Sequence, residues 1–109
     1  MREFAVRALR QNGYIVFERE NVKDGLDIFE KEKGNFQLIF TDVVLPGQSG
    51  IQLVNMLLSR KPGLRVLLCS GYTDQKSHRQ ILIDRGLPFL QKPYSIINLL
   101  KTVKDVLAQ

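Results

Sequence analysis

Short apolar runs alternate along this chain with longer segments of helical periodicity, and this alternation limits the folds that the chain can adopt. The apolar spacing predicts five helices, at residues 2–12, 21–34, 51–61, 74–85 and 95–107. Four β-branched or aromatic runs predict strands, at residues 14–17, 36–41, 65–70 and 89–91. Strands that alternate with helices form parallel sheets, and right-handed crossovers place the helices on both faces. The expected fold class is therefore α/β, with a doubly wound parallel sheet.

The length of 109 residues suits one domain that spans residues 1–109. No apolar stretch approaches the roughly 20 residues that span a bilayer. The N-terminus shows no signal-peptide pattern, so a cytoplasmic protein without a membrane partner is expected. The single cysteine, Cys69, lies in an apolar run and is interpreted as a buried core residue. The net charge of +5 is spread over several segments, so a nucleic-acid partner is not expected.

The most informative stretch begins at Leu38, where an apolar run ends at the carboxylate of Asp42 and a Pro, two Gly and a helical pattern follow. Ligands of open α/β sheets bind at the carboxyl ends of the strands. Ser70 ends the next predicted strand and Lys92 follows the last one, so these side chains should meet Asp42 at one sheet edge. Each residue alone could be a turn, cap or surface residue. Together they suit phosphoryl transfer, with the carboxylate as nucleophile and Mg²⁺ as the expected cofactor.

Three groups of residues carry a resemblance to a known family: Asp42 with Pro46 and Gly50 behind it, Ser70-Gly71-Tyr72, and Phe89-Leu90-Gln91-Lys92-Pro93. Together they resemble the receiver domain of two-component response regulators and hybrid histidine kinases, across essentially the whole chain. The resemblance implies a flavodoxin-like (CheY-like) fold and a phosphoprotein of phosphorelay signal transduction. The Ser-Gly-Tyr sequence and the turn after Lys92 look more like receivers of hybrid sensor kinases than like those of transcription factors.

The resemblance also implies a role for each site residue. Asp42 is similar to the residue that accepts a phosphoryl group from a histidine kinase or phosphotransfer protein and becomes an aspartyl phosphate. Ser70 would bond that phosphoryl group, and Lys92 would pair with it. Asp42 and the backbone carbonyl of Val44 would bind Mg²⁺.

A conformational switch is implied as well. Phosphorylation would draw Ser70 and Phe89 inward and change a protein-binding face formed by residues 74–108. The peptide bond between Lys92 and Pro93 is expected to be cis, as is usual in the family. Such a domain promotes its own phosphorylation without being a conventional enzyme.

One element of the family pattern is absent from this sequence. The family fold begins with a strand, central in a sheet ordered 2-1-3-4-5, that ends in two acidic metal ligands, whereas Glu3 is the only acid here before Glu18. We therefore expect weak Mg²⁺ binding, slow or absent phosphorylation and two unpaired strand edges. Three arrangements would compensate for the missing strand: residues 14–17 move beside residues 36–41, two chains associate or swap elements to complete the sheet, or the natural protein is longer. Self-association is our hypothesis.

Two other functions are alternatives. A pseudo-receiver would keep the fold as a dimerisation or interaction module without phosphotransfer. The missing acidic pair favours it, and the presence of Asp42, Ser70 and Lys92 together opposes it. An unrelated flavodoxin-like enzyme or nucleotide binder would need a Gly-rich phosphate loop, which this sequence lacks.

Overall fold

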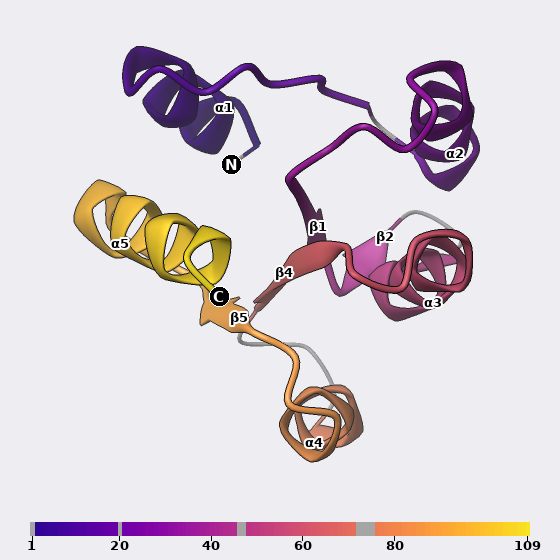
Figure 1. Ribbon diagram of the computed structural model, residues 1–109. Helices are drawn as coiled ribbons and strands as arrows, with labels where there is room; N and C mark the ends of the chain where they lie inside the picture. Colours follow the sequence, from indigo (N-terminus) through magenta and orange to yellow (C-terminus); the bar gives the residue numbers. More distant parts are fainter. Residues whose placement is uncertain (1, 20, 46–47, 72–75) are drawn as a thin grey trace.

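The computed structural model describes residues 2–19, 21–45, 48–71 and 76–109 of the chain (Figure 1). The helices within these residues are α1 (Arg2–Gln11), α2 (Val22–Lys31), α3 (Gly50–Arg60), α4 (Lys76–Asp84) and α5 (Ile96–Leu107). The strands are β1 (Leu38–Asp42), β2 (Val44–Leu45), β3 (Gln48–Ser49), β4 (Arg65–Ser70) and β5 (Phe89–Gln91). Pro46, Tyr72 and the first two residues of the predicted helix at 74–85 lie outside the described residues.

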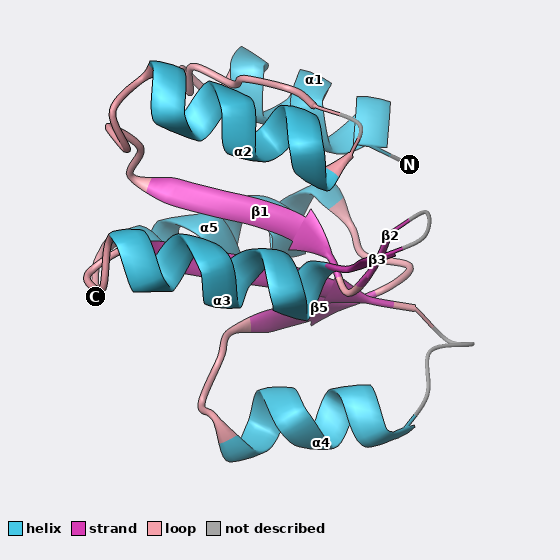
Figure 2. Ribbon diagram, turned by 90° about the vertical axis from the view of Figure 1, so that its right-hand side faces the viewer, coloured by secondary structure: helices cyan, strands magenta, loops and turns pink. Residues whose placement is uncertain are grey.

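The strands β1, β4 and β5 form one parallel sheet in the order β1-β4-β5 (Figure 2). In the register of β1 with β4, Asp42 lies opposite Cys69, and in that of β4 with β5, Ser70 lies opposite Gln91. The three strands therefore end together at one edge of the sheet. The strands β2 and β3, which the sequence did not predict, form a short antiparallel hairpin just beyond this edge.

Helices cover both faces of the sheet, and each face has its own buried cluster of apolar side chains (Figure 1). One cluster joins α1 and α5 to the sheet, and the other joins α2, α3 and α4 to it. Alternate residues of β4 enter opposite clusters: Val66 and Leu68 face one, and Leu67 and Cys69 face the other. This arrangement confirms the predicted α/β fold with helices on both faces of a parallel sheet.

Local sequence signals place most helix starts correctly. The Asn21 side chain accepts a hydrogen bond from the Asp24 N–H at 2.8 Å, and Ser95 Oγ accepts one from the Asn98 N–H at 3.0 Å. Both residues therefore cap their helices as predicted, because a side-chain oxygen satisfies an N–H group that the first turn leaves free. Among the described residues, no helix is both long enough and apolar enough to cross a membrane.

The predicted strand at residues 14–17 is wrong. The backbone of this segment bonds back to α1: the Tyr14 N–H donates to the Leu9 carbonyl at 3.1 Å, and the Arg10 guanidinium donates to the Val16 carbonyl at 2.9 Å. Since α1 packs on one face of the sheet and α2 on the other, the segment has to cross the edge of β1 between two anchored helices. No backbone hydrogen bond joins it to β1 in the described part of the chain, so the sheet has three strands where four were predicted.

Candidate functional site

An ion pair bridges the outer two strands of the sheet at their carboxyl ends. Asp42 is the last residue of β1, and Lys92 directly follows β5. Lys92 Nζ lies 2.9 Å from Asp42 Oδ1, with the Asp42 side chain 46% exposed and the Lys92 side chain 21% exposed. The carboxylate can therefore be reached from solvent while the ammonium group is held beside it. A partly exposed ion pair of this kind contributes little to stability.

Ser70 occupies the end of the strand between them. Its backbone carbonyl accepts a hydrogen bond from the Lys92 N–H at 2.8 Å, which ties β4 to the start of the loop after β5. The residue is fully buried, and its hydroxyl has no hydrogen-bond partner among the described residues. Buried hydroxyl groups are nearly always paired, so this unpaired hydroxyl at the end of β4 is a candidate hydrogen-bond donor to a ligand.

The loop that follows β1 is held too tightly to admit a side chain at Gly50. The Gly50 N–H donates to the Val43 carbonyl at 2.7 Å, and the Val43 N–H donates to the Cys69 carbonyl at 2.9 Å. A Cβ atom on Gly50 would lie 1.8 Å from the Asp42 carbonyl oxygen and 3.3 Å from Thr41 Oγ1. The start of α3 therefore touches the backbone of the candidate nucleophile. The sequence indicated Gly50 only through the family resemblance.

Cys69 is buried, as predicted, and Tyr94, which sequence reasoning missed, packs against the same apolar cluster. Burial, with a further contribution from the Asp42 carboxylate, raises the pKa of the Cys69 thiol to about 12. Burial also raises the pKa of the Tyr94 phenol. The Tyr94 ring lies 6.4 Å from that of Phe40 and 6.1 Å from that of Phe4. The only available sequence signal was the position of Tyr94, directly after the Lys-Pro turn.

The raised pKa of Cys69 predicts an unreactive thiol in the native chain. Only the thiolate reacts with iodoacetamide, and a thiol with a pKa of about 12 stays protonated at mildly alkaline pH. From the thiolate fractions, we expect native alkylation near pH 8.5 to be about 1,000-fold slower than in denaturant, where the pKa returns to its ordinary value. The native rate should rise about tenfold per pH unit and level off only as the pH approaches 12. Equal rates with and without denaturant, followed by mass spectrometry, would contradict this prediction.

The structure also locates the remaining residues that the sequence analysis singled out. The peptide bond between Lys92 and Pro93 is cis. Phe89 begins β5 opposite Leu68 and is partly buried against the cluster on the α3 and α4 face. Val44 lies two residues beyond Asp42 in β2, opposite Ser49.

The described residues do not fit a Mg²⁺ site. Receiver domains typically bind this ion at an acidic pocket, and Mg²⁺ requires a near-octahedral set of oxygen ligands. The described residues contain no group of three or more His, Cys, Asp or Glu side chains that could hold a metal. Of the described carboxylates, Asp42 is the one in contact with Lys92, and its Oδ1 faces the ammonium group. Additional carboxylates would be needed to complete the site.

The structure places a carboxylate, a buried hydroxyl and an ammonium group at the ends of successive strands of a parallel sheet, as the sequence predicted for a receiver-like α/β domain. The family comparison agrees: the profile of the response regulator receiver domain matches residues 1–104. The chain therefore belongs to the response regulator receiver domain family, whose members act in two-component signalling.

Individual relatives support this membership. The chain is 34% identical over 102 residues to the sensor kinase CckA of Brucella abortus, which covers 94% of this chain and 11% of the kinase. It is 27% identical over 107 residues to the response regulator receiver protein CpdR of the same organism, covering 98% of this chain and 88% of CpdR. The chain thus spans about a tenth of the first relative and most of the second.

Solved structures show the same fold. The receiver domain of NtrX from Brucella abortus superposes with a TM-score of 0.87 at 22% identity, covering 99% of this chain and 90% of that one. A receiver domain protein from Clostridium thermocellum gives a TM-score of 0.87 at 20% identity, covering 97% of this chain and 84% of that one.

Proposed function

We propose that this receiver domain accepts a phosphoryl group on Asp42 from a histidine kinase or phosphotransfer protein. The observation that carries the proposal is the 2.9 Å contact between Lys92 Nζ and Asp42 Oδ1 at the carboxyl edge of the sheet. It holds a partly exposed carboxylate next to a fixed positive charge, which is the arrangement that a nucleophile for phosphorus needs.

In the proposed reaction each of the three side chains has its own role. With Oδ1 held by Lys92, the second Asp42 oxygen attacks phosphorus while the bond from phosphorus to the donor imidazole breaks. Lys92 then offsets negative charge on the phosphoryl oxygens, and the buried Ser70 hydroxyl donates a hydrogen bond to one of them. The unpaired hydroxyl of Ser70 would thereby gain a partner in the phosphorylated state.

The proposal also includes the conformational change that phosphorylation would cause. A new bond to Ser70 would pull the end of β4 toward Asp42, and Phe89 of the neighbouring strand would move with it. The affected surface would be the face formed by residues 74–108, which would bind a partner protein. The cytoplasmic location expected from the sequence also remains a prediction.

Replacing Ser70 by alanine (Ser70→Ala) should slow phosphorylation without lowering the free energy of unfolding. Removing a buried hydroxyl that has no partner should leave the free energy of unfolding unchanged or raise it by up to about 1 kcal/mol. Phosphorylation should slow about tenfold, since one donor to the phosphoryl oxygens is lost. Urea denaturation and a phosphorylation time course would measure both. A large loss of stability would show that the hydroxyl is bonded in the native chain.

A pseudo-receiver is the second candidate function, and the incomplete Mg²⁺ ligand set favours it. Such a domain would keep the fold and bind partners without accepting a phosphoryl group. It requires none of the chemistry of Asp42, so charge-neutral variants at this position would leave its partner binding intact.

Intact mass after incubation with acetyl phosphate and Mg²⁺ tests the proposal, with Asp42→Asn as the control. We expect a gain of about 80 Da in the parent chain only, the mass of one phosphoryl group. An equal gain in the Asp42→Asn variant would place the phosphoryl group on another residue and overturn the assignment.

A further inference from the structure

The side chain of Tyr94 joins the loop after β5 to three other elements. Its ring centroid lies 6.4 Å from that of Phe40 in β1 and 6.1 Å from that of Phe4 in α1. Tyr94 also packs against the apolar cluster that contains Cys69 of β4. Aromatic rings at these separations attract each other beyond the effect of their buried area. Tyr94 therefore fixes this loop to the sheet and to α1 at the same time.

Two of these contacts lie on the face of the sheet from which the Asp42 side chain projects. Phe40 and Asp42 are two residues apart in β1, and alternate residues of a strand project from the same face. Cys69 lies opposite Asp42 in the register of β1 with β4. Burial raises the pKa of the Tyr94 phenol, and Cys69 and Asp42 raise it further. The phenol is thus close enough to the carboxylate to feel its charge.

Lys92 is connected to this anchor by a short and stiff piece of backbone. Only Pro93 separates Lys92 from Tyr94, and the proline ring fixes its φ angle. On the other side, the Lys92 N–H donates to the Ser70 carbonyl at 2.8 Å. The backbone of Lys92 is therefore held from both directions. Without the anchor at Tyr94, the loop would be free to carry the ammonium group away from Asp42 Oδ1, which now lies 2.9 Å from it.

We propose that Tyr94 is a positioning residue for phosphoryl transfer, whose ring holds Lys92 in place beside Asp42. This inference rests on the proposed function of Asp42 and adds a residue that acts through Lys92 without touching the phosphoryl group. The contacts with Phe4 and Phe40 are made by the ring, so the ring is required and the hydroxyl contributes little. Such positioning matters because a displacement of about 1 Å can slow a catalysed reaction about 100-fold.

A purely structural role is the competing explanation. Tyr94 would then stabilise the apolar cluster, and its loss would lower the free energy of unfolding without moving Lys92 in the folded chain. Tyr14 offers a matched control because it packs against the same cluster. It follows the C-terminal end of α1, whereas Phe4, the partner of Tyr94, lies near the N-terminal end. Replacing either tyrosine by leucine removes the same aromatic group from the cluster.

Chemical labelling of Lys92 tests the proposal without requiring phosphorylation. The folded chain is treated briefly with an amine-reactive ester, and peptide mass spectrometry compares Lys92 with the exposed Lys101. Asp42→Asn, which removes the ion pair, sets the upper limit of the Lys92 labelling rate. We expect Tyr94→Leu to approach this limit, with labelling about two- to fivefold faster than in the parent chain. Tyr94→Phe, which keeps the ring, should restore the parent rate, and Tyr14→Leu should leave it unchanged.

Phe4→Ala is a second variant with less effect on the core. The Phe4 side chain is 40% exposed, and its loss removes one of the two ring contacts of Tyr94. We expect Lys92 to be labelled about twofold faster in this variant. The inference therefore remains testable if Tyr94→Leu does not fold.

A double-mutant cycle with acetyl phosphate and Mg²⁺ shows whether Tyr94 acts through Lys92. We expect Tyr94→Leu to slow phosphorylation about tenfold in the parent chain and to have no further effect in Lys92→Ala, because two changes to one interaction are not additive. Equal slowing in both backgrounds would overturn the proposal, as would unchanged Lys92 labelling in Tyr94→Leu or Phe4→Ala. A parent chain that gains no phosphoryl group would overturn the proposed function of Asp42, whereas faster labelling would still show that Tyr94 holds the ion pair together.

Discussion

Replacing Gly50 by alanine (Gly50→Ala) is expected to destabilise the chain by about 3 kcal/mol or more and to abolish phosphorylation of Asp42. The added Cβ atom would lie 1.8 Å from the Asp42 carbonyl oxygen and 2.9 Å from its carbon. Both atoms are backbone, so no side-chain rotation relieves the overlap. Either α3 moves away from the sheet or Asp42 moves away from Lys92, and the second outcome breaks the 2.9 Å contact at the site.

The matched control is Gly25→Ala, which changes a glycine inside α2. A Cβ atom there meets nothing within 4 Å, and alanine favours the helix over glycine by about 0.5–1 kcal/mol. Urea denaturation should therefore show opposite changes in the free energy of unfolding for the two substitutions. If Gly50→Ala were as stable as the parent, the close approach of α3 to Asp42 would be wrong.

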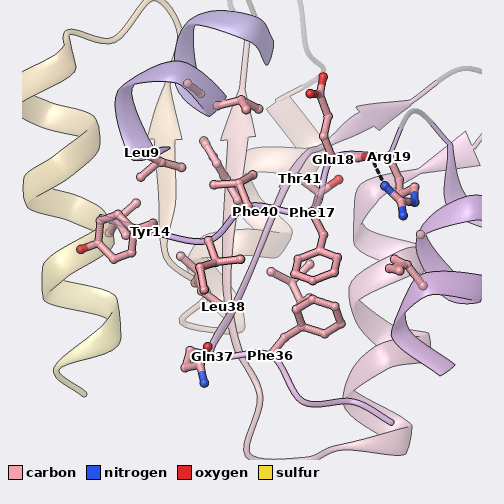
Figure 3. Close-up of a pocket in the computed structure, with 18 of the residues that line it drawn as sticks. Leu9, Tyr14, Phe17, Glu18, Arg19, Phe36, Gln37, Leu38, Phe40 and Thr41 are labelled. Atoms are coloured by element: carbon pink, nitrogen blue, oxygen red, sulfur yellow. Dashed lines mark hydrogen bonds between the residues drawn. The ribbon is translucent and has the colours of Figure 1, made fainter. Parts of the chain in front are cut away.

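An engineered N-terminal extension that fills the cavity between β1 and the segment joining α1 to α2 (Figure 3) is expected to stabilise the chain by about 3 kcal/mol. Figure 2 shows the N-terminus on the side where β1 ends, so a strand placed before α1 would run parallel to β1. Five Val or Ile residues would cover the free β1 edge and both clusters. The melting temperature should rise by roughly 10 °C, measured by circular dichroism.

Two acidic residues at the end of the extension should also change the chemistry. They would lie near Asp42 and supply the carboxylates that the Mg²⁺ site lacks, so phosphorylation by acetyl phosphate should accelerate about tenfold or more. A second extension with the same apolar run and two amides in place of the acids is the control. This control extension should raise the free energy of unfolding as much as the acid-bearing one does, but phosphorylation should stay slow. Equal acceleration by both extensions would mean that the acids are not what the site needs.

Much of this fold could be predicted because its signals are local. The strands at 65–70 and 89–91 end where their polar residues begin, and the Asn21 and Ser95 caps mark helix starts. Because parallel strands end on the same side of a sheet, the sequence predicted that Asp42, Ser70 and Lys92 would converge. The structure brings Asp42 and Lys92 into direct contact.

The errors arise where structure depends on distant partners. Residues 14–17 have the composition of a strand, yet a strand needs a neighbouring edge, and the anchored helices α1 and α2 hold this segment away from β1. The hairpin of β2 and β3 is too short to leave a periodic pattern. The contact of Tyr94 with Phe40 joins residues more than fifty positions apart in the sequence. The absence of room for a side chain at Gly50 depends on the Asp42 backbone eight residues earlier. Neither contact leaves a local sequence pattern.

The most direct test of the central claim is phosphoryl transfer from a phosphorylated histidine kinase domain to the acid-bearing extended chain, compared with its Asp42→Asn variant. We predict that the extended chain gains one phosphoryl group, that hydroxylamine removes it as expected for an acyl phosphate, and that the variant gains none. A folded extended chain that binds Mg²⁺ but gains no phosphoryl group would contradict the account and identify the domain as a pseudo-receiver.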